Sequence, residues 1–75
     1  MREELIEMIA NIAEVSSNEV MPESSLVNDL EMDSLMLLDL TVKLQKVINQ
    51  EIKPEELVAL KTVNDVFDFV KEKKK

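Results

Sequence analysis

Apolar residues recur every three or four positions along most of this chain, and no segment alternates apolar and polar residues cleanly at period two. That spacing is the helical period, and it predicts an all-α fold without a sheet. The first helix is marked by one stripe, which consists of Leu5, Ile6, Ile9, Ile12 and Ala13. No domain boundary or internal repeat is visible, so we expect residues 1–75 to form a single domain.

The second predicted helix is the longest and runs from about Ser34 to Asn49. Asp33 directly precedes it and can cap it by accepting a backbone N–H bond. Asp39, Lys43 and Lys46 mark its solvent face. Its apolar face is so broad that it predicts a central helix buried against several neighbours, through Leu35, Leu37, Leu38, Leu40, Val42, Leu44, Val47 and Ile48.

Two shorter helices are predicted near the end of the chain. Pro54 suits the first position of a short third helix, whose apolar side consists of Leu57, Val58 and Leu60. Thr62 can cap a fourth helix, with Asp65 three residues further on. The apolar stripe of the fourth helix consists of Val63, Val66, Phe67 and Val70, with Phe69 close to it. The sequence therefore predicts a small four-helix bundle.

The segment 16–33 has no sustained periodicity and contains Pro22, which interrupts a helix. We interpret it as a long ordered loop between the first two helices, held on them by Val20, Leu26, Val27 and Leu30. Ser16 and Glu19 have the spacing of a capping box, which predicts a short helical turn there. Loops of this length are often functional.

The chain lacks glycine, cysteine and histidine. Glycine-rich phosphate loops are therefore excluded, as are disulfides, thiolate nucleophiles and histidine bases. The net charge of −7 argues against a nucleic-acid partner. No membrane span or N-terminal signal pattern is visible, so we expect a cytoplasmic protein without a membrane partner.

The negative charge is concentrated before the second helix. Residues 1–33 hold nine carboxylates and one basic residue, Arg2, whereas residues 34–75 hold seven carboxylates and eight lysines. An acidic surface of this kind favours partners that carry basic patches. Taken alone, this charge distribution favours a solvated acidic loop.

Ser34 differs from the other serines because it opens the main helix, directly after Asp33 and the acidic loop. A phosphate ester on its hydroxyl would face unsatisfied N–H groups and the positive end of the helix dipole. The spacing leaves two interpretations open: a serine that carries a phosphate-linked group, or a serine that only helps to cap the helix.

The run Leu30-Glu31-Met32-Asp33-Ser34-Leu35 resembles the modification motif of acyl carrier proteins, in which a long loop ends in a sequence like Asp-Leu-Gly-x-Asp-Ser-Leu. The same family has a short helix near a proline, matched here by residues 52–56. A Thr-Val pair opens its last helix, matched by Thr62-Val63. The resemblance covers nearly all of the chain.

The resemblance implies that a phosphopantetheinyl transferase attaches 4′-phosphopantetheine to Ser34, with Asp33 serving in transferase recognition. The thiol of this cofactor would carry acyl groups between the acyl-transfer or synthase enzymes of a fatty-acid, polyketide or specialised pathway. The chain itself would be a monomer and not an enzyme. The resemblance assigns partner binding to Glu31, Leu35, Met36 and Asp39. Met32 and Met36 flank the attachment point, where flexible thioethers suit an apolar guest but also serve as core filler.

Two departures from the family pattern carry information. Glu31 stands where many members have glycine, so the tight loop must form without glycine's conformational freedom. Met36 stands where fatty-acid carriers have a carboxylate, and Gln45-Lys46-Val47 replaces an acidic run. We therefore expect partners other than a standard fatty-acid synthase.

Three other interpretations remain. The chain could be an unmodified adaptor of carrier fold that binds a partner protein through its acidic surface. An enzyme would have to use Asp29, Asp33 or Asp39 as acid and base, but a solvated loop gives little reason for the perturbed pKa values that such catalysis needs. No residue spacing matches a calcium loop, so we expect no dedicated metal site and only weak cation binding.

Overall fold

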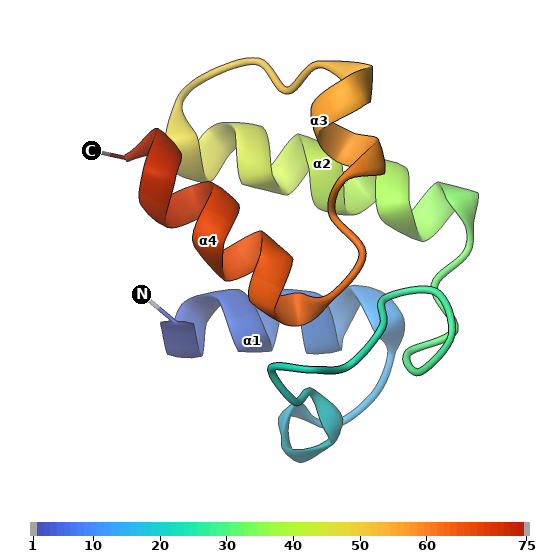
Figure 1. Cartoon of the computed structure of the whole chain (residues 1–75). Helices are drawn as coiled ribbons and strands as arrows, with labels where there is room; N and C mark the ends of the chain where they lie inside the picture. The colour runs from blue at the N-terminus through green and yellow to red at the C-terminus, as the bar shows by residue number, and fades with distance from the viewer. Residues whose placement is uncertain (1, 75) are drawn as a thin grey trace.

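Four α-helices account for most of the chain in the computed structural model, which describes residues 2–74 (Figure 1). In chain order they are α1 (Arg2–Ala13), α2 (Ser34–Ile48), α3 (Pro54–Val58) and α4 (Val63–Lys73), with a 3-10 turn, η1, at Ser17–Glu19. The predicted all-α bundle, with its long first loop and short third helix, is confirmed. Within residues 2–74 the extended contacts amount to one isolated bridge between Ser25 and Thr62.

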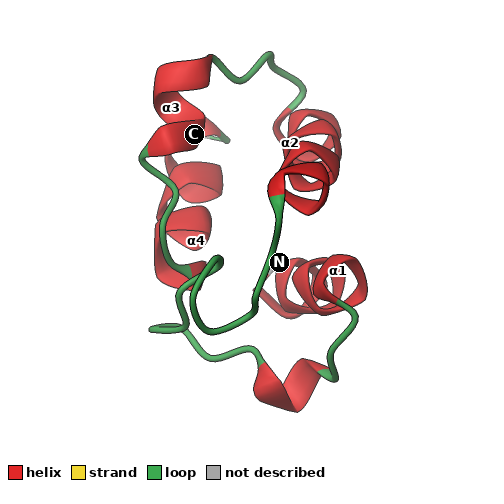
Figure 2. Cartoon of the chain, turned by 90° about the vertical axis from the view of Figure 1, so that its right-hand side faces the viewer, coloured by secondary structure: helices red, strands yellow, loops and turns green. Residues whose placement is uncertain are grey.

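The helices form two layers. Figure 2 looks nearly along α1 and α2, which lie on one side, while α3 and α4 lie on the other. Helix α1 contacts α2 and α4, and α2 also contacts α4. The core fills the space between these three helices, and its most deeply buried side chains are Ile9, Leu26, Leu40, Leu44, Val63, Val66 and Val70. Each buried aliphatic side chain contributes about 1.5–3 kcal/mol.

Helix α2 buries one face and exposes the other. Leu40, Leu44 and Ile48 are buried as predicted. Leu35, Leu38 and Val42 are 77%, 59% and 44% exposed, so the prediction of a helix buried against several neighbours was wrong for these three. The physical reason is the size of the chain: α1 and α4 cover one side of α2, and no element within residues 2–74 covers the other.

The long loop is ordered, as predicted, and is tied to the connection between α3 and α4. Leu26 N–H donates to the Lys61 carbonyl at 2.9 Å, and Val63 N–H donates to the Ser24 carbonyl at 3.0 Å. A third bond, of 2.8 Å, joins Asn64 N–H to the Pro22 carbonyl. The loop therefore acts as part of the scaffold.

The apolar anchors of this loop are Val20, Leu26 and Leu30, which are buried. Val27 was predicted to join them but is about half exposed, because it lies at the surface beside α3. The predicted turn at Ser17–Glu19 is present as η1, but Ser16 makes no side-chain cap bond, so that predicted capping box was wrong.

The predicted starts of the third and fourth helices are confirmed. Pro54 is the first residue of α3, and Thr62 caps α4 through a capping box in which Thr62 Oγ1 accepts from Asp65 N–H at 3.1 Å. The stripe of α4 is buried as predicted. Val58, which was predicted on the apolar side of α3, is exposed, because α3 packs on the core through the partly buried Leu57.

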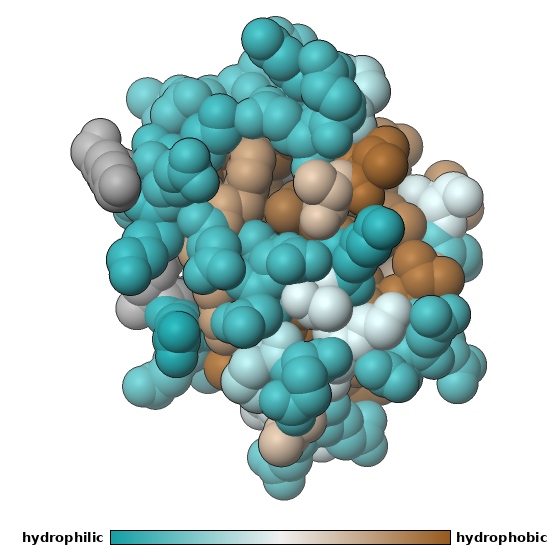
Figure 3. Space-filling model, in the orientation of Figure 1, coloured by the Kyte–Doolittle hydropathy of each residue, from teal (hydrophilic) through white to brown (hydrophobic). Residues whose placement is uncertain are grey.

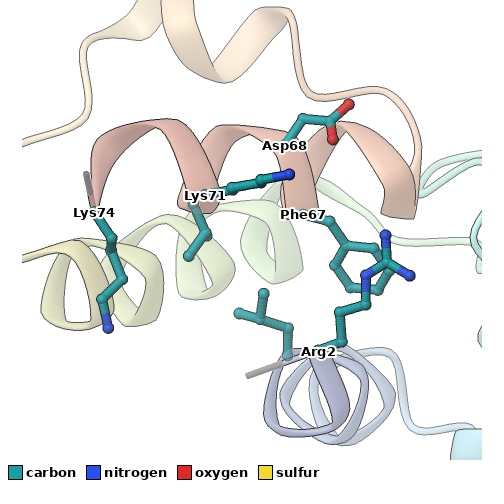
Figure 4. Close-up of a pocket in the computed structure, with 7 residues that line it drawn as sticks. Arg2, Phe67, Asp68, Lys71 and Lys74 are labelled. Carbon is teal, nitrogen blue, oxygen red and sulfur yellow. The ribbon is translucent and has the colours of Figure 1, made fainter.

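The start of α1 and the end of α4 meet around a surface pocket of about 460 Å³ (Figure 4). The Arg2 guanidinium lies over the ring of Phe67, 5.1 Å from its centroid. Lys71 and Lys74 extend from α4 beside it, where cations favour the negative end of the helix dipole. This basic end lies far from the start of α2 (Figure 1). Among the described residues, no helix combines the length and apolar character needed to cross a membrane.

Candidate functional site

Ser34 is the first residue of α2, and its side chain is exposed. The cap of α2 is the preceding residue: Asp33 Oδ1 accepts from Met36 N–H at 2.9 Å, and its backbone carbonyl accepts from Leu37 N–H. Within residues 2–74 the Ser34 hydroxyl makes no hydrogen bond. The cap bond of α2 is therefore made by Asp33 and not by Ser34.

The loop before Ser34 is fixed by its own polar side chains. Asp29 Oδ2 accepts from Ser25 N–H at 2.7 Å, and Ser25 Oγ accepts from Asn28 N–H at 3.1 Å. Further along, Met32 N–H donates to the Leu26 carbonyl at 3.0 Å. These bonds hold the approach to α2 in one conformation, so Ser34 sits at a defined point on the surface.

Glu31 adopts a left-handed conformation, with φ of 55°. Its neighbours Leu30 and Met32 both point into the core, and the backbone must turn sharply at the exposed residue between them. A residue with a Cβ atom costs about 1 kcal/mol more than glycine in this region. The tight turn expected from the motif is thus present, and it is made without glycine.

An apolar groove of about 420 Å³ lies between the loop, α2 and α3. Leu37, three residues after Ser34, contributes to its wall, so the groove begins about one helical turn from the hydroxyl. Hydrophobic surface gathers on the corresponding side of Figure 3, between α3 and the loop. The residues that line the groove are Ser25, Val27, Asn28, Leu37, Leu57, Val58, Leu60 and Lys61.

This groove explains two residues whose exposure the sequence did not predict. Val27 and Val58 face it from opposite sides instead of entering the core. Met32 is buried and Met36 is half-buried against the core, and neither lines the groove. Of the two roles open to these methionines, the structure favours core filler.

The expected partner-binding residues lie on the surface around Ser34. Glu31, Leu35 and Asp39 are exposed, whereas Met36 is only half-exposed. Asp39 Oδ1 forms an ion pair of 2.8 Å with Lys43 Nζ one turn further along α2. The leucines Leu35 and Leu38, which the helical pattern placed inside, are therefore more accessible than Met36.

The carboxylates considered as catalytic candidates do not converge. Asp29 is bonded to the loop, Asp33 to the first turn of α2, and Asp39 to Lys43. Across the described part of the chain, no three carboxylates lie close enough to hold a metal ion.

The start of α2 is chemically suited to a phosphodiester on Ser34. The backbone N–H groups of Ser34 and Leu35 have no acceptor among the described residues, and they lie at the positive end of a 15-residue helix. Such donors favour an anion. The adjacent Asp33 carboxylate opposes one, but its Oδ1 is directed at Met36 N–H.

Comparison with known proteins agrees with this architecture. A family described as "Phosphopantetheine attachment site" matches residues 3–70. An acyl carrier protein of Syntrophus aciditrophicus is 37% identical over 71 residues, covering 95% of this chain and 89% of that protein. One from Thermobifida fusca is 42% identical over 88% of this chain and 84% of its own length. A meromycolate extension acyl carrier protein of Mycolicibacterium aurum is 35% identical, with 88% and 68% covered.

The helical fold and the family match over residues 3–70 define a phosphopantetheine-binding carrier domain. The chain belongs to the acyl carrier protein family. Its members are carriers and not enzymes, and their cofactor is 4′-phosphopantetheine.

Proposed function

We propose that this chain carries acyl groups on a 4′-phosphopantetheine arm attached to Ser34. The observation that carries the proposal is the exposed Ser34 hydroxyl at the start of α2, which is left without a hydrogen bond because Asp33 caps the helix. A transferase can reach such a hydroxyl without unfolding any part of the chain.

In the proposed modification, the Ser34 oxygen forms a bond to the phosphorus of the phosphopantetheine half of coenzyme A. The pyrophosphate bond of coenzyme A breaks, adenosine 3′,5′-bisphosphate leaves, and the hydroxyl loses its proton. The free N–H groups of Ser34 and Leu35 then face the phosphodiester, and Asp33 serves in recognition by the transferase. Once attached, the arm supplies a thiol that holds an acyl group as a thioester.

The groove between α2 and α3 is the proposed resting place of an apolar cargo. It starts near Ser34, and Leu37, Leu57 and Leu60 give it an apolar lining. Helix α3 has no fully buried residue and packs on the core through the partly buried Leu57, so a guest would displace it at less cost than one of the core helices.

Residues 1–75 are proposed to act as a monomeric cytoplasmic domain that meets a phosphopantetheinyl transferase and then acyl-transfer or synthase enzymes. Glu31, Asp33 and Asp39 supply the acidic part of the recognition surface, and Leu35 and Met36 the apolar part. Met36 and Lys46, which stand where fatty-acid carriers are acidic, favour a specialised acyl or polyketide pathway over a standard fatty-acid synthase.

The direct test is the intact mass of the purified chain after incubation with coenzyme A, Mg²⁺ and a phosphopantetheinyl transferase. We expect the wild type and Ser17→Ala, which removes another exposed serine, to gain one phosphopantetheine group, and Ser34→Ala to gain none. Failure of the wild type to gain mass with several transferases would defeat the proposal. Retention of cellular function by Ser34→Ala would instead identify an unmodified adaptor.

A further inference from the structure

The outward face of α2 carries an apolar ridge formed by Leu35, Leu38 and Val42. These residues are three and four positions apart, so their side chains line up along one side of the helix. The ridge lies opposite Leu40 and Leu44, which face the core. A single exposed leucine is ordinary, but three large apolar residues in line form a contact surface.

The charges beside this ridge change along its length. At the start of α2, Glu31 and Asp33 are exposed and form no ion pair within residues 2–74. In the middle, Asp39 is neutralised by Lys43 at 2.8 Å. One turn beyond Val42, the exposed Lys46 continues the line of the ridge and has no carboxylate partner in the described chain.

The far end of the ridge opens into a shallow depression of about 500 Å³ that Val42 and Lys46 share. The other residues that line it are Gln45, Asn49, Gln50 and Glu51. Three of these four are neutral, and the Glu51 carboxylate balances the charge of Lys46. The end of α2 is therefore close to neutral, whereas its start is acidic.

We infer that α2 is a charge-asymmetric docking helix, whose partner enzyme meets it with an apolar patch that carries cations opposite Glu31 and Asp33 and none opposite Lys43 and Lys46. The inference rests on the proposed function, because it describes the enzymes that would exchange cargo at Ser34. It predicts that the basic patch on those enzymes lies opposite the first turn of α2 and does not extend along the rest of the helix.

Desolvation without a compensating ion pair is the physical basis of this selectivity. A partner with a basic patch along the whole of α2 would bring its further cations against Lys43, which is paired with Asp39, and against Lys46, whose charge Glu51 balances. Those cations would lose water without gaining a free carboxylate, whereas cations opposite Glu31 and Asp33 gain one. A partner whose cations stop after the first turn keeps the apolar contact and avoids this cost, so the end of α2 acts against the wrong partner.

A second copy of this chain is a poorer occupant than an enzyme. Two copies, each with a net charge of −7, repel one another. Helices that run parallel would in addition place the two acidic starts near each other. Helices that run antiparallel would bring the acidic start of each copy near the lysines of the other, and the net charge alone then opposes the contact. An enzyme with a matching charge pattern meets neither difficulty.

The test measures binding of the modified chain to a probe enzyme, the transacylase of a bacterial fatty-acid synthase with a basic docking patch. We compare the wild type with the double variant Lys43→Glu/Lys46→Glu. The control, Lys71→Glu/Lys74→Glu, makes the same change in net charge at the end of α4, at residues that line neither the ridge nor the depression at the end of α2. We expect the α2 variant to bind at least about tenfold more tightly, with a steeper dependence on salt, and the control to change less than about threefold.

Equal gains in the α2 variant and the control would overturn the inference, because net charge alone would then explain them, and so would no gain in either. Dimerisation of the wild type that Leu38→Ser abolishes would also overturn it, by giving the ridge to a second copy. Mass gain on Ser34 is recorded for every variant. A variant that is modified normally but binds without the expected difference refutes the docking inference and leaves the proposed function intact.

Discussion

Both faces of α2 carry leucines, but one face packs in the core and the other is exposed to solvent. Leu40 and Leu44 are fully buried against α1 and α4, whereas Leu35 and Leu38 are mostly exposed within two turns of them. Nothing in the residue type separates the two pairs. The neighbours that the rest of the chain supplies decide which leucines stabilise the fold and which remain available to a partner.

The largest expected difference between the faces is in stability. Leu44→Ala should lower the free energy of unfolding by about 3 kcal/mol, since it removes buried apolar surface and leaves a cavity. Leu38→Ala, the matched truncation on the other face, should change it by less than about 0.5 kcal/mol. Urea denaturation followed by circular dichroism measures both. Similar losses in the two variants would mean that the outward face is covered after all.

Carboxylates that are only half-buried also stabilise this fold, and acid titration measures their contribution. Backbone N–H groups of Lys61 and Thr62 donate to Asp65 at 3.0 Å and hold the pKa of this carboxyl below its ordinary value of 3.8. The Lys73 side chain, at the end of α4, donates a hydrogen bond to Glu56 on α3 and lowers the pKa of that carboxyl.

A pKa that is lower in the folded state stabilises the fold above the unfolded pKa, and this stability is lost as pH falls through the folded pKa. We expect Asp65→Asn to be about 1 kcal/mol less stable than the wild type at pH 7. The gap should close progressively below about pH 4, when the wild-type carboxyl becomes neutral too. Thermal unfolding of both proteins from pH 7 to pH 2.5 measures it, and a gap that persists at the lowest pH would contradict the capping role.

The smallest expected effect separates two carboxylates on the outward side of α2. Asp33→Ala removes the cap bond to Met36 N–H and should cost about 1 kcal/mol or slightly less. Asp39→Ala removes an exposed ion pair and should cost no more than about 0.5 kcal/mol. Urea midpoints rank the two. The reverse order would show that the ion pair, and not the cap, holds the first turns of the helix.

Local signals in the sequence predicted the helices well. Asp33, Pro54, Thr62 and Asp65 act within a few residues of themselves, so their roles at the helix starts could be read from spacing alone. Ser16 is the exception, because η1 forms without its side-chain bond. A single 3-10 turn has few donors to satisfy and does not require the cap.

Burial was harder to predict, because it depends on neighbours distant in the sequence. Leu35, Leu38 and Val42 fit a helical stripe as well as Leu40 and Leu44 do, and periodicity cannot say how many sides of a helix will be covered. Val27 and Val58 were missed for a related reason: they line a groove that forms only when the loop and α3 come together. At the site, Ser34 and Asp33 stood out in the sequence, but the division of labour between them needed coordinates.

The separate roles of Asp33, which caps α2, and Ser34, which does not, have a consequence for folding and modification. Because Asp33 alone closes the first turn of α2, a group added to the neighbouring oxygen breaks no bond on which the helix depends. In the proposed modification, the chain would therefore not need the phosphopantetheine group in order to fold. The unmodified and modified forms should then share one backbone conformation and differ mainly in the group attached to Ser34.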